Sequence, residues 1–137
     1  MFVDTFADID RGYFVRNGLV DRRYNPRLGS HVVKNLHSAL NASGEPVKRG
    51  GSHEVTSARI CTMKVGEDVV GLVLPEQKVR VDRVPAERGD AGTAGTARCT
   101  DLETGRVTRV RWRRVDEGLE LPGGLACAVP TLIWFGA

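Results

Sequence analysis

The sequence predicts a mainly β protein, in which an N-terminal strand-loop-helix segment is followed by a small antiparallel β-sandwich. Three observations support this prediction. Short apolar runs separated by turns rich in Gly, Pro and Asp recur through the second region of the 137-residue chain. One stretch before them carries apolar residues at helical spacing. A polar, Gly-rich segment separates the two regions.

Residues 1–41 are expected to form the strand-loop-helix segment. The chain opens on an apolar run at residues 1–3, which is typical of a buried strand, and a polar loop follows over residues 7–29. From about Arg27 or Ser30 to Leu40, apolar residues recur on one helical face, and Ser30 is a candidate N-cap. One β/α unit of this kind cannot bury both of its faces alone, so it requires further elements around it.

A polar, flexible linker is expected over residues 42–53, because this stretch has the Gly, Ser and Pro content of a linker. The domain boundary is placed there, and residues 54–137 are expected to form the β-sandwich domain.

The β-sandwich domain is predicted from short strand candidates at regular spacing, joined by turn residues. Clear turns are expected at residues 66–68, 101–105, 116–118 and 122–124. The last strand is apolar without alternation, which indicates burial on both of its faces. The strand candidates are residues 54–65, 69–74, 78–84, 94–102, 106–115, 119–121 and 131–135.

The charge of the chain is modest and dispersed. Twenty basic and 17 acidic residues leave a formal net charge of +3. Arg109, Arg111 and Arg113 alternate with Val110 and Trp112, which is typical of the solvated face of a strand. A nucleic-acid partner is not expected, because such binding usually needs a clustered basic face with stacking aromatic residues.

No membrane partner is expected either. No apolar run approaches the ~18 residues of a membrane span, and no cationic segment followed by an apolar stretch opens the chain. As written, the sequence predicts a soluble cytoplasmic protein. That expectation does not extend to a chain whose true N-terminus lies upstream, because a signal peptide would lie there too.

No cofactor or metal is expected. Cys61, Cys99 and Cys127 form no C-x-x-C pair and have no histidine at ligand spacing, so they are interpreted as buried free thiols. His31 and His37 are six residues apart and do not share a helical face, which argues against a metal site on the helix.

Several segments resemble parts of TIM-barrel glycoside hydrolases. Residues 18–21, Gly-Leu-Val-Asp, and residues 25–27, Asn-Pro-Arg, resemble the loop after the eighth barrel strand, and the helix that follows resembles the last barrel helix. Residues 70–75, 101–105 and 130–135 resemble parts of the β-sandwich that commonly follows such barrels. The resemblance implies that residues 1–41 are the terminal unit, a remnant of a (β/α)8 barrel.

The resemblance also implies that this chain is not catalytic alone. Glycoside hydrolysis needs two carboxyl groups across the scissile bond, and in these barrels both are expected on earlier strands. A complete barrel needs ~250 residues, more than this chain has. The expected function is a C-terminal fragment or accessory region that supports a sugar-hydrolysing barrel. The alternative is a stand-alone β-sandwich module that binds carbohydrate or another protein.

The expected partners are therefore the missing barrel portion or a carbohydrate, and the oligomeric state is left open. Anchoring of the loop and pairing with arginine are the favoured interpretation of the carboxylates at the expected strand end, and the alternative is that they line the sugar site of a complete barrel. The candidate substrate-binding residues are Asp4, Asp8, Asp10, Arg11 and Tyr13.

Three aromatic residues of the second region are also candidates for a carbohydrate-binding platform: Trp112, Trp134 and Phe135. Packing in the core is the favoured interpretation for all three, because large aromatic side chains usually dominate cores.

Overall fold

The computed structural model describes residues 28–87 and 92–136, and in these ranges one helix precedes eight strands. The helix is α1 (Leu28–Asn41). The strands are β1 (Val47–Val55), β2 (Ala58–Val65), β3 (Asp68–Pro75), β4 (Val79–Val84), β5 (Ala94–Asp101), β6 (Val107–Val115), β7 (Gly118–Cys127) and β8 (Thr131–Phe135). The prediction of a mainly β protein is confirmed, and so is the predicted helix before the sheet.

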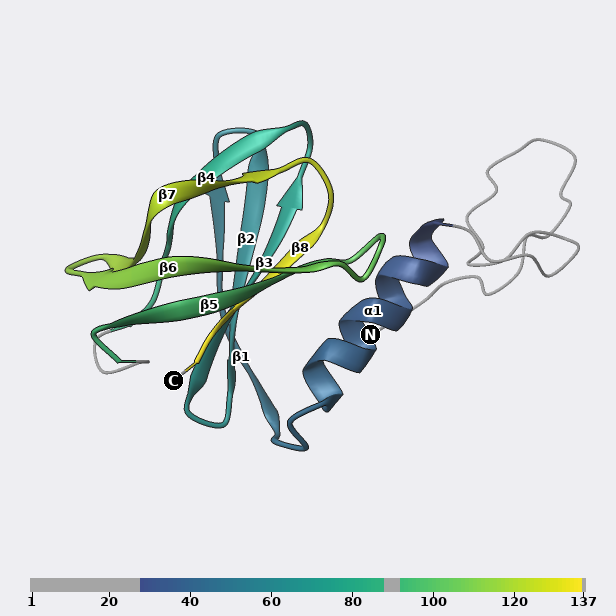
Figure 1. The fold of residues 1–137 in the computed structure, drawn as a ribbon, viewed down its shortest axis with the longest axis horizontal. Helices are drawn as coiled ribbons and strands as arrows, with labels where there is room; N and C mark the ends of the chain where they lie inside the picture. The colour runs from purple at the N-terminus through teal and green to yellow at the C-terminus, as the bar shows by residue number, and fades with distance from the viewer. Residues whose placement is uncertain (1–27, 88–91, 137) are drawn as a thin grey trace, which may run out of the picture.

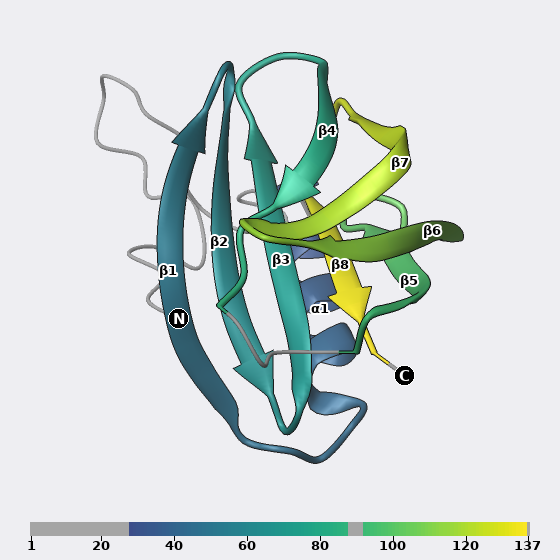
Figure 2. The ribbon, with the colours of Figure 1, turned by 90° about the vertical axis from the view of Figure 1, so that its left-hand side faces the viewer.

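The eight strands form one antiparallel sheet in the order β1-β2-β3-β8-β5-β6-β7-β4. The sheet curls, so that β4, β6 and β7 cross over the face of β2 and β3 (Figures 1 and 2). The expected sandwich of two sheets is therefore corrected to one continuous curled sheet. Strand twist and bulges allow a single sheet to cover its own inner face.

The inside of the curled sheet holds the larger apolar core. Ile60 of β2, Val84 of β4, Leu119 of β7 and Phe135 of β8 are all fully buried there. The rings of Trp112 and Phe135 meet edge to face, with centroids 5.7 Å apart. Burial of every residue of β8 confirms the prediction for residues 131–135.

Helix α1 covers the outer face of the sheet, on the side away from β4, β6 and β7 (Figures 1 and 2). Its apolar residues Val32, Leu36 and Leu40 pack against a second buried cluster that includes Leu132 and Trp134. This spacing places the three side chains on one face of the helix. The sheet that α1 covers is antiparallel, and the expected remnant of a parallel barrel is not confirmed.

Strand β1 begins inside the segment that was expected to be a linker, so that part of the prediction is corrected. Val47 to Val55 pair with β2 along their whole length, except at a bulge between Arg49 and Ser52. The backbone N–H of Gly51 donates to the hydroxyl of Thr62, and that hydroxyl donates to the Gly51 carbonyl. The Gly-rich stretch that looked like a linker is thus a bulged edge strand.

Two other boundaries differ from the prediction. A turn at Thr56 and Ser57 divides the expected strand 54–65 into β1 and β2. The expected turn at 122–124 lies inside β7, where the register with β4 shifts and Gly124 has φ of +63°. The positive φ disfavours residues that carry a Cβ, and a Cβ here would also meet the side chains of Arg80 and Asp82, so this bulge favours glycine.

Candidate functional site

A row of three side chains crosses the outer face of the sheet beside α1. Trp134 of β8 lies directly opposite Arg98 of β5, and Arg98 lies directly opposite Arg109 of β6. Because directly opposite residues of antiparallel strands point to the same face, the indole and the two guanidinium groups share one surface.

The indole of Trp134 is held by contacts on two sides. Its Nε1–H donates to Oδ2 of Asp68 over 2.8 Å. The guanidinium carbon of Arg98 lies 5.3 Å from the ring centroid, within cation–π distance. Trp134 as a whole is only 9% exposed, in the cluster against which α1 packs, and Arg98 lies over its ring. Trp134 therefore fixes the positions of the charged groups around it.

A second row runs beside the first. When the same register is extended past the paired residues, Asp68 of β3 lies beside Gly136, and Gly136 lies beside Thr96 of β5. Thr96 in turn lies directly opposite Arg111 of β6. A Cβ at Gly136 would lie 3.0 Å from Oδ2 of Asp68. Glycine at this position thus leaves room for the carboxylate that accepts the indole N–H.

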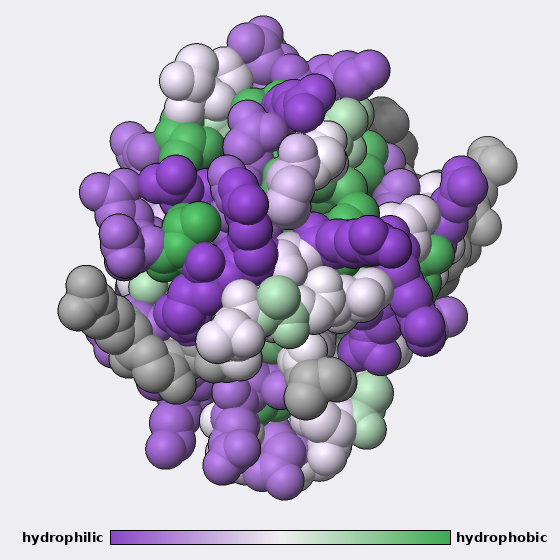
Figure 3. Space-filling model, turned by 60° about the vertical axis from the view of Figure 1, so that its left-hand side comes forward, coloured by the Kyte–Doolittle hydropathy of each residue, from purple (hydrophilic) through white to green (hydrophobic). Residues whose placement is uncertain are grey.

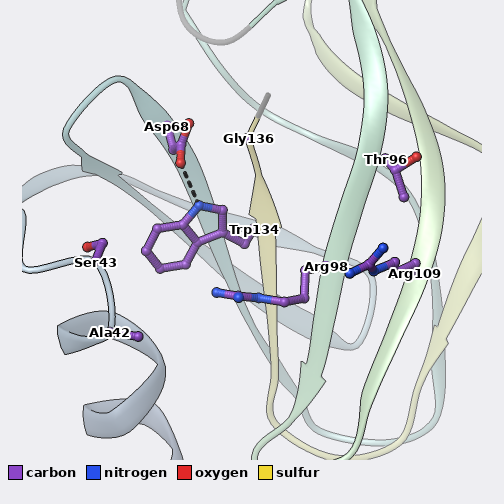
Figure 4. Close-up of a pocket in the computed structure, with 8 residues that line it drawn as sticks. All are labelled: Ala42, Ser43, Asp68, Thr96, Arg98, Arg109, Trp134 and Gly136. Carbon is purple, nitrogen blue, oxygen red and sulfur yellow. Dashed lines mark hydrogen bonds between the residues drawn. The ribbon is translucent and has the colours of Figure 1, made fainter.

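Except for Arg111, the residues of these two rows line an open pocket of about 590 Å³ (Figure 4). Figure 4 shows Arg98 and Trp134 side by side, with Arg109 beyond Arg98 and Asp68 at the indole nitrogen. The turn that follows α1 contributes one side of the pocket, through Ala42 and Ser43. The lining residues are Ala42, Ser43, Asp68, Thr96, Arg98, Arg109, Trp134 and Gly136. This volume is typical of sites for small ligands.

The arginines of this surface have no carboxylate partner among the described residues. Elsewhere in the sheet, carboxylates pair with Arg59, Arg80, Arg83 and Arg113. No such ion pair is formed by Arg98, Arg109 or Arg111 within residues 28–87 and 92–136. The pocket thus presents guanidinium N–H groups that can donate hydrogen bonds to an anionic ligand.

Arg113 shows the contrast on the same strand. Its Nε–H donates to Oε2 of Glu120 on β7, and this hydrogen bond lowers the pKa of the Glu120 carboxyl. The free cationic groups of β6 therefore end before Arg113.

Polar acceptors and hydroxyl groups complete the pocket. Asp68 has a second oxygen, Oδ1, that accepts no hydrogen bond from the residues the structure describes. The hydroxyl groups of Ser43 and Thr96 also line the pocket. The site therefore combines groups that bind an anion with groups that bind hydroxyls. In the described ranges, no cluster of His, Cys, Asp and Glu is suited to hold a metal ion.

The substrate-binding residues expected from the sequence, Asp4, Asp8, Asp10, Arg11 and Tyr13, lie outside the described residues. Among the aromatic candidates, Trp112 and Phe135 are core residues, as the favoured interpretation had it. Trp134 is also buried, and its edge borders the pocket.

Sequence reasoning missed Asp68, Thr96 and Arg98 as site residues, and it took Arg109 for a solvated strand position. Arg109 is indeed exposed. The alternation along residues 106–115 placed it on an outer face, but no pattern in the sequence showed that Trp134 lies in the same row. That information is contained in the pairing of β8 with β5.

Comparisons with family models, with curated proteins and with solved structures found no match for this chain. The resemblance to TIM-barrel glycoside hydrolases therefore stays a prediction. In the portion of the chain that the structure describes, no helix has the length and apolar character needed to cross a membrane.

Proposed function

We propose that this chain is a carbohydrate-binding module whose pocket beside Trp134 holds an acidic sugar. The observation that carries the proposal is the exposed, unpaired guanidinium of Arg109 in a pocket that also holds the fixed Arg98–Trp134–Asp68 group. A guanidinium group presents parallel N–H donors that match the two oxygens of a carboxylate.

The carboxylate of Asp68 narrows the class of ligand. It would repel a ligand that is negatively charged at every contact, whereas it accepts hydrogen bonds from hydroxyl groups. Ser43 and Thr96 add hydroxyl groups to the same lining. A sugar acid carries one anionic group among several hydroxyls, so its chemistry complements both halves of the pocket.

This function is compatible with both arrangements expected from the sequence. A stand-alone module would bind a polysaccharide directly, and an accessory region would hold the polysaccharide near a sugar-hydrolysing barrel. In either arrangement the chain contributes binding, and its pocket does not act as a catalytic centre.

The test is a titration of the protein with galacturonate, in which NMR monitors the amide chemical shifts of β5, β6 and β8. We expect saturable shifts in the wild type and much smaller ones with galactose, which lacks the carboxylate. Arg109→Gln should weaken galacturonate binding on the order of ten-fold, the effect of one charge-assisted hydrogen bond.

Lys78→Gln is the matched control, because it removes one positive charge from an exposed position that does not line the pocket. Its affinity for galacturonate should equal that of the wild type. Equal affinities for galactose and galacturonate, or an unchanged affinity in Arg109→Gln, would show that the proposal is wrong.

A further inference from the structure

Arg111 extends the unpaired positive charge beyond the pocket. It lies on the same face of β6 as Arg109, two residues further along, which corresponds to roughly 6.7 Å along the strand. It is exposed and lies directly opposite Thr96, which lines the pocket. The surface next to the pocket therefore continues as a cationic one.

Three guanidinium groups without carboxylate partners are thus gathered at the junction of β5 and β6. Arg98 and Arg109 are directly opposite, and like charges in that position destabilise a sheet. Arg111 adds a third positive charge beside them. A bound anion would relieve this repulsion, and a ligand with several anionic groups would relieve more of it.

The positive stretch has a defined end. The next residue on this face of β6, Arg113, is paired with Glu120 and is not available to a ligand. At the other end, Trp134 and the turn that follows α1 border the pocket. The free surface therefore runs from Trp134 past Arg109 to Arg111.

Large exposed apolar side chains are few among the described residues, although Val107 lies on the same face of β6, two residues before Arg109. The face shown in Figure 3 is mainly hydrophilic, and its apolar residues lie in small separate areas. In the part of the chain that the structure describes, the large apolar residues that are exposed are Val47, Val55, Leu74 and Val107. Charge complementarity is therefore the main source of affinity for a ligand that reaches beyond the pocket.

We propose that the site binds a polysaccharide with acid groups on successive sugars: one acidic sugar in the pocket at Arg109 and the next on Arg111. This inference rests on the proposed function and names its ligand as a polymer. A nucleic acid also carries regularly spaced anions, but the Asp68 carboxylate beside Trp134 and Arg98 disfavours a phosphate there.

The experiment compares the affinity of galacturonate, digalacturonate and hexagalacturonate for the full chain by calorimetry at 50 and 300 mM salt. In the wild type, affinity should rise on the order of ten-fold from the monomer to the longer ligands, and the gain should shrink at high salt. Arg111→Gln should bind the monomer like the wild type and lose most of the gain with length.

Lys78→Gln again controls for net charge and should keep the whole gain. A wild type without a gain, or an equal gain in Arg111→Gln, would overturn the polymer inference while the monomer result still supports the proposed function. If the wild type does not bind galacturonate, the proposed function itself is wrong. If an oligothymidylate binds more tightly than hexagalacturonate and this binding is weakened in Arg111→Gln, the ligand is a nucleic acid and the polysaccharide inference is wrong.

Discussion

Burial inside the curled sheet changes the pKa of a cysteine thiol. Cys99 of β5 is 2% exposed in the larger core, close enough to Cys127 of β7 for the two thiols to interact. Burial raises the pKa of the Cys99 thiol from 9.0 to about 12, and Cys127 adds to this rise. Both thiols are free, as the sequence predicted, whereas Cys61 is only half-buried.

The raised pKa of Cys99 predicts a loss of stability at high pH. The folded state keeps the thiol protonated while the unfolded state releases the proton, so the full contribution is present below pH 9 and declines as pH rises towards 12. At pH 10, this thiol should lower the free energy of unfolding by about 1 kcal/mol.

Urea denaturation of the wild type and Cys99→Ala at pH 7 and pH 10 measures this effect. The variant should be less stable at pH 7, because a cavity replaces the sulfur, but its stability should fall less between the two pH values. Equal falls in both proteins would contradict the assignment.

At the scale of elements, α1 is held to the sheet by one apolar face. Val32, Leu36, Ala39 and Leu40 contact the outer cluster, and the Nδ2–H of Asn35 donates to the carbonyl of Leu102 over 2.8 Å. Leu102 belongs to the turn that joins β5 and β6, so the helix is attached to the connection between the strands that carry Arg98 and Arg109. The position of α1 and the shape of the pocket are therefore coupled.

Truncation of this helical face should destabilise the protein. Leu36→Ala removes half-buried methyl groups, and we expect a loss of about 1–2 kcal/mol, less than at a fully buried leucine. Lys34→Ala, at an exposed position of the same helix, should change stability by no more than about 0.5 kcal/mol. Urea midpoints measure both, and similar values for the two variants would show that α1 contributes little to the fold.

At the scale of the whole molecule, strands β2, β3 and β8 contribute residues to both apolar clusters. Val69 and Val70 of β3 point to opposite faces, and so do Ile133 and Trp134 of β8. A strand that is buried on both faces links the inner core to the helix layer. Neither cluster can be exposed without disturbing the other.

One cooperative unfolding transition should follow from this arrangement. Trp112 reports on the inner core and Trp134 on the helix layer, so tryptophan fluorescence follows both clusters. Its urea transition should coincide with the loss of far-UV circular dichroism. Two separated midpoints would indicate that α1 and its cluster unfold independently of the sheet.

The sequence alone determined the local features of this protein. Apolar spacing in 28–41 specified the helix, and turn residues such as those at 101–105 specified most strand ends. Burial of the apolar run at 131–135 also followed from its pattern, because a strand without polar positions has no face for water.

Only the tertiary structure decided the topology and the site. A curled single sheet and a sandwich of two sheets have the same alternation along each strand, so the sequence pattern does not distinguish them. The pairing of β8 with β3 and β5 brings Trp134 beside Asp68 and Arg98, although Asp68 is 66 residues away in sequence. Long-range register is set by packing of the whole sheet, and the pocket exists only where that register places these side chains in adjacent rows.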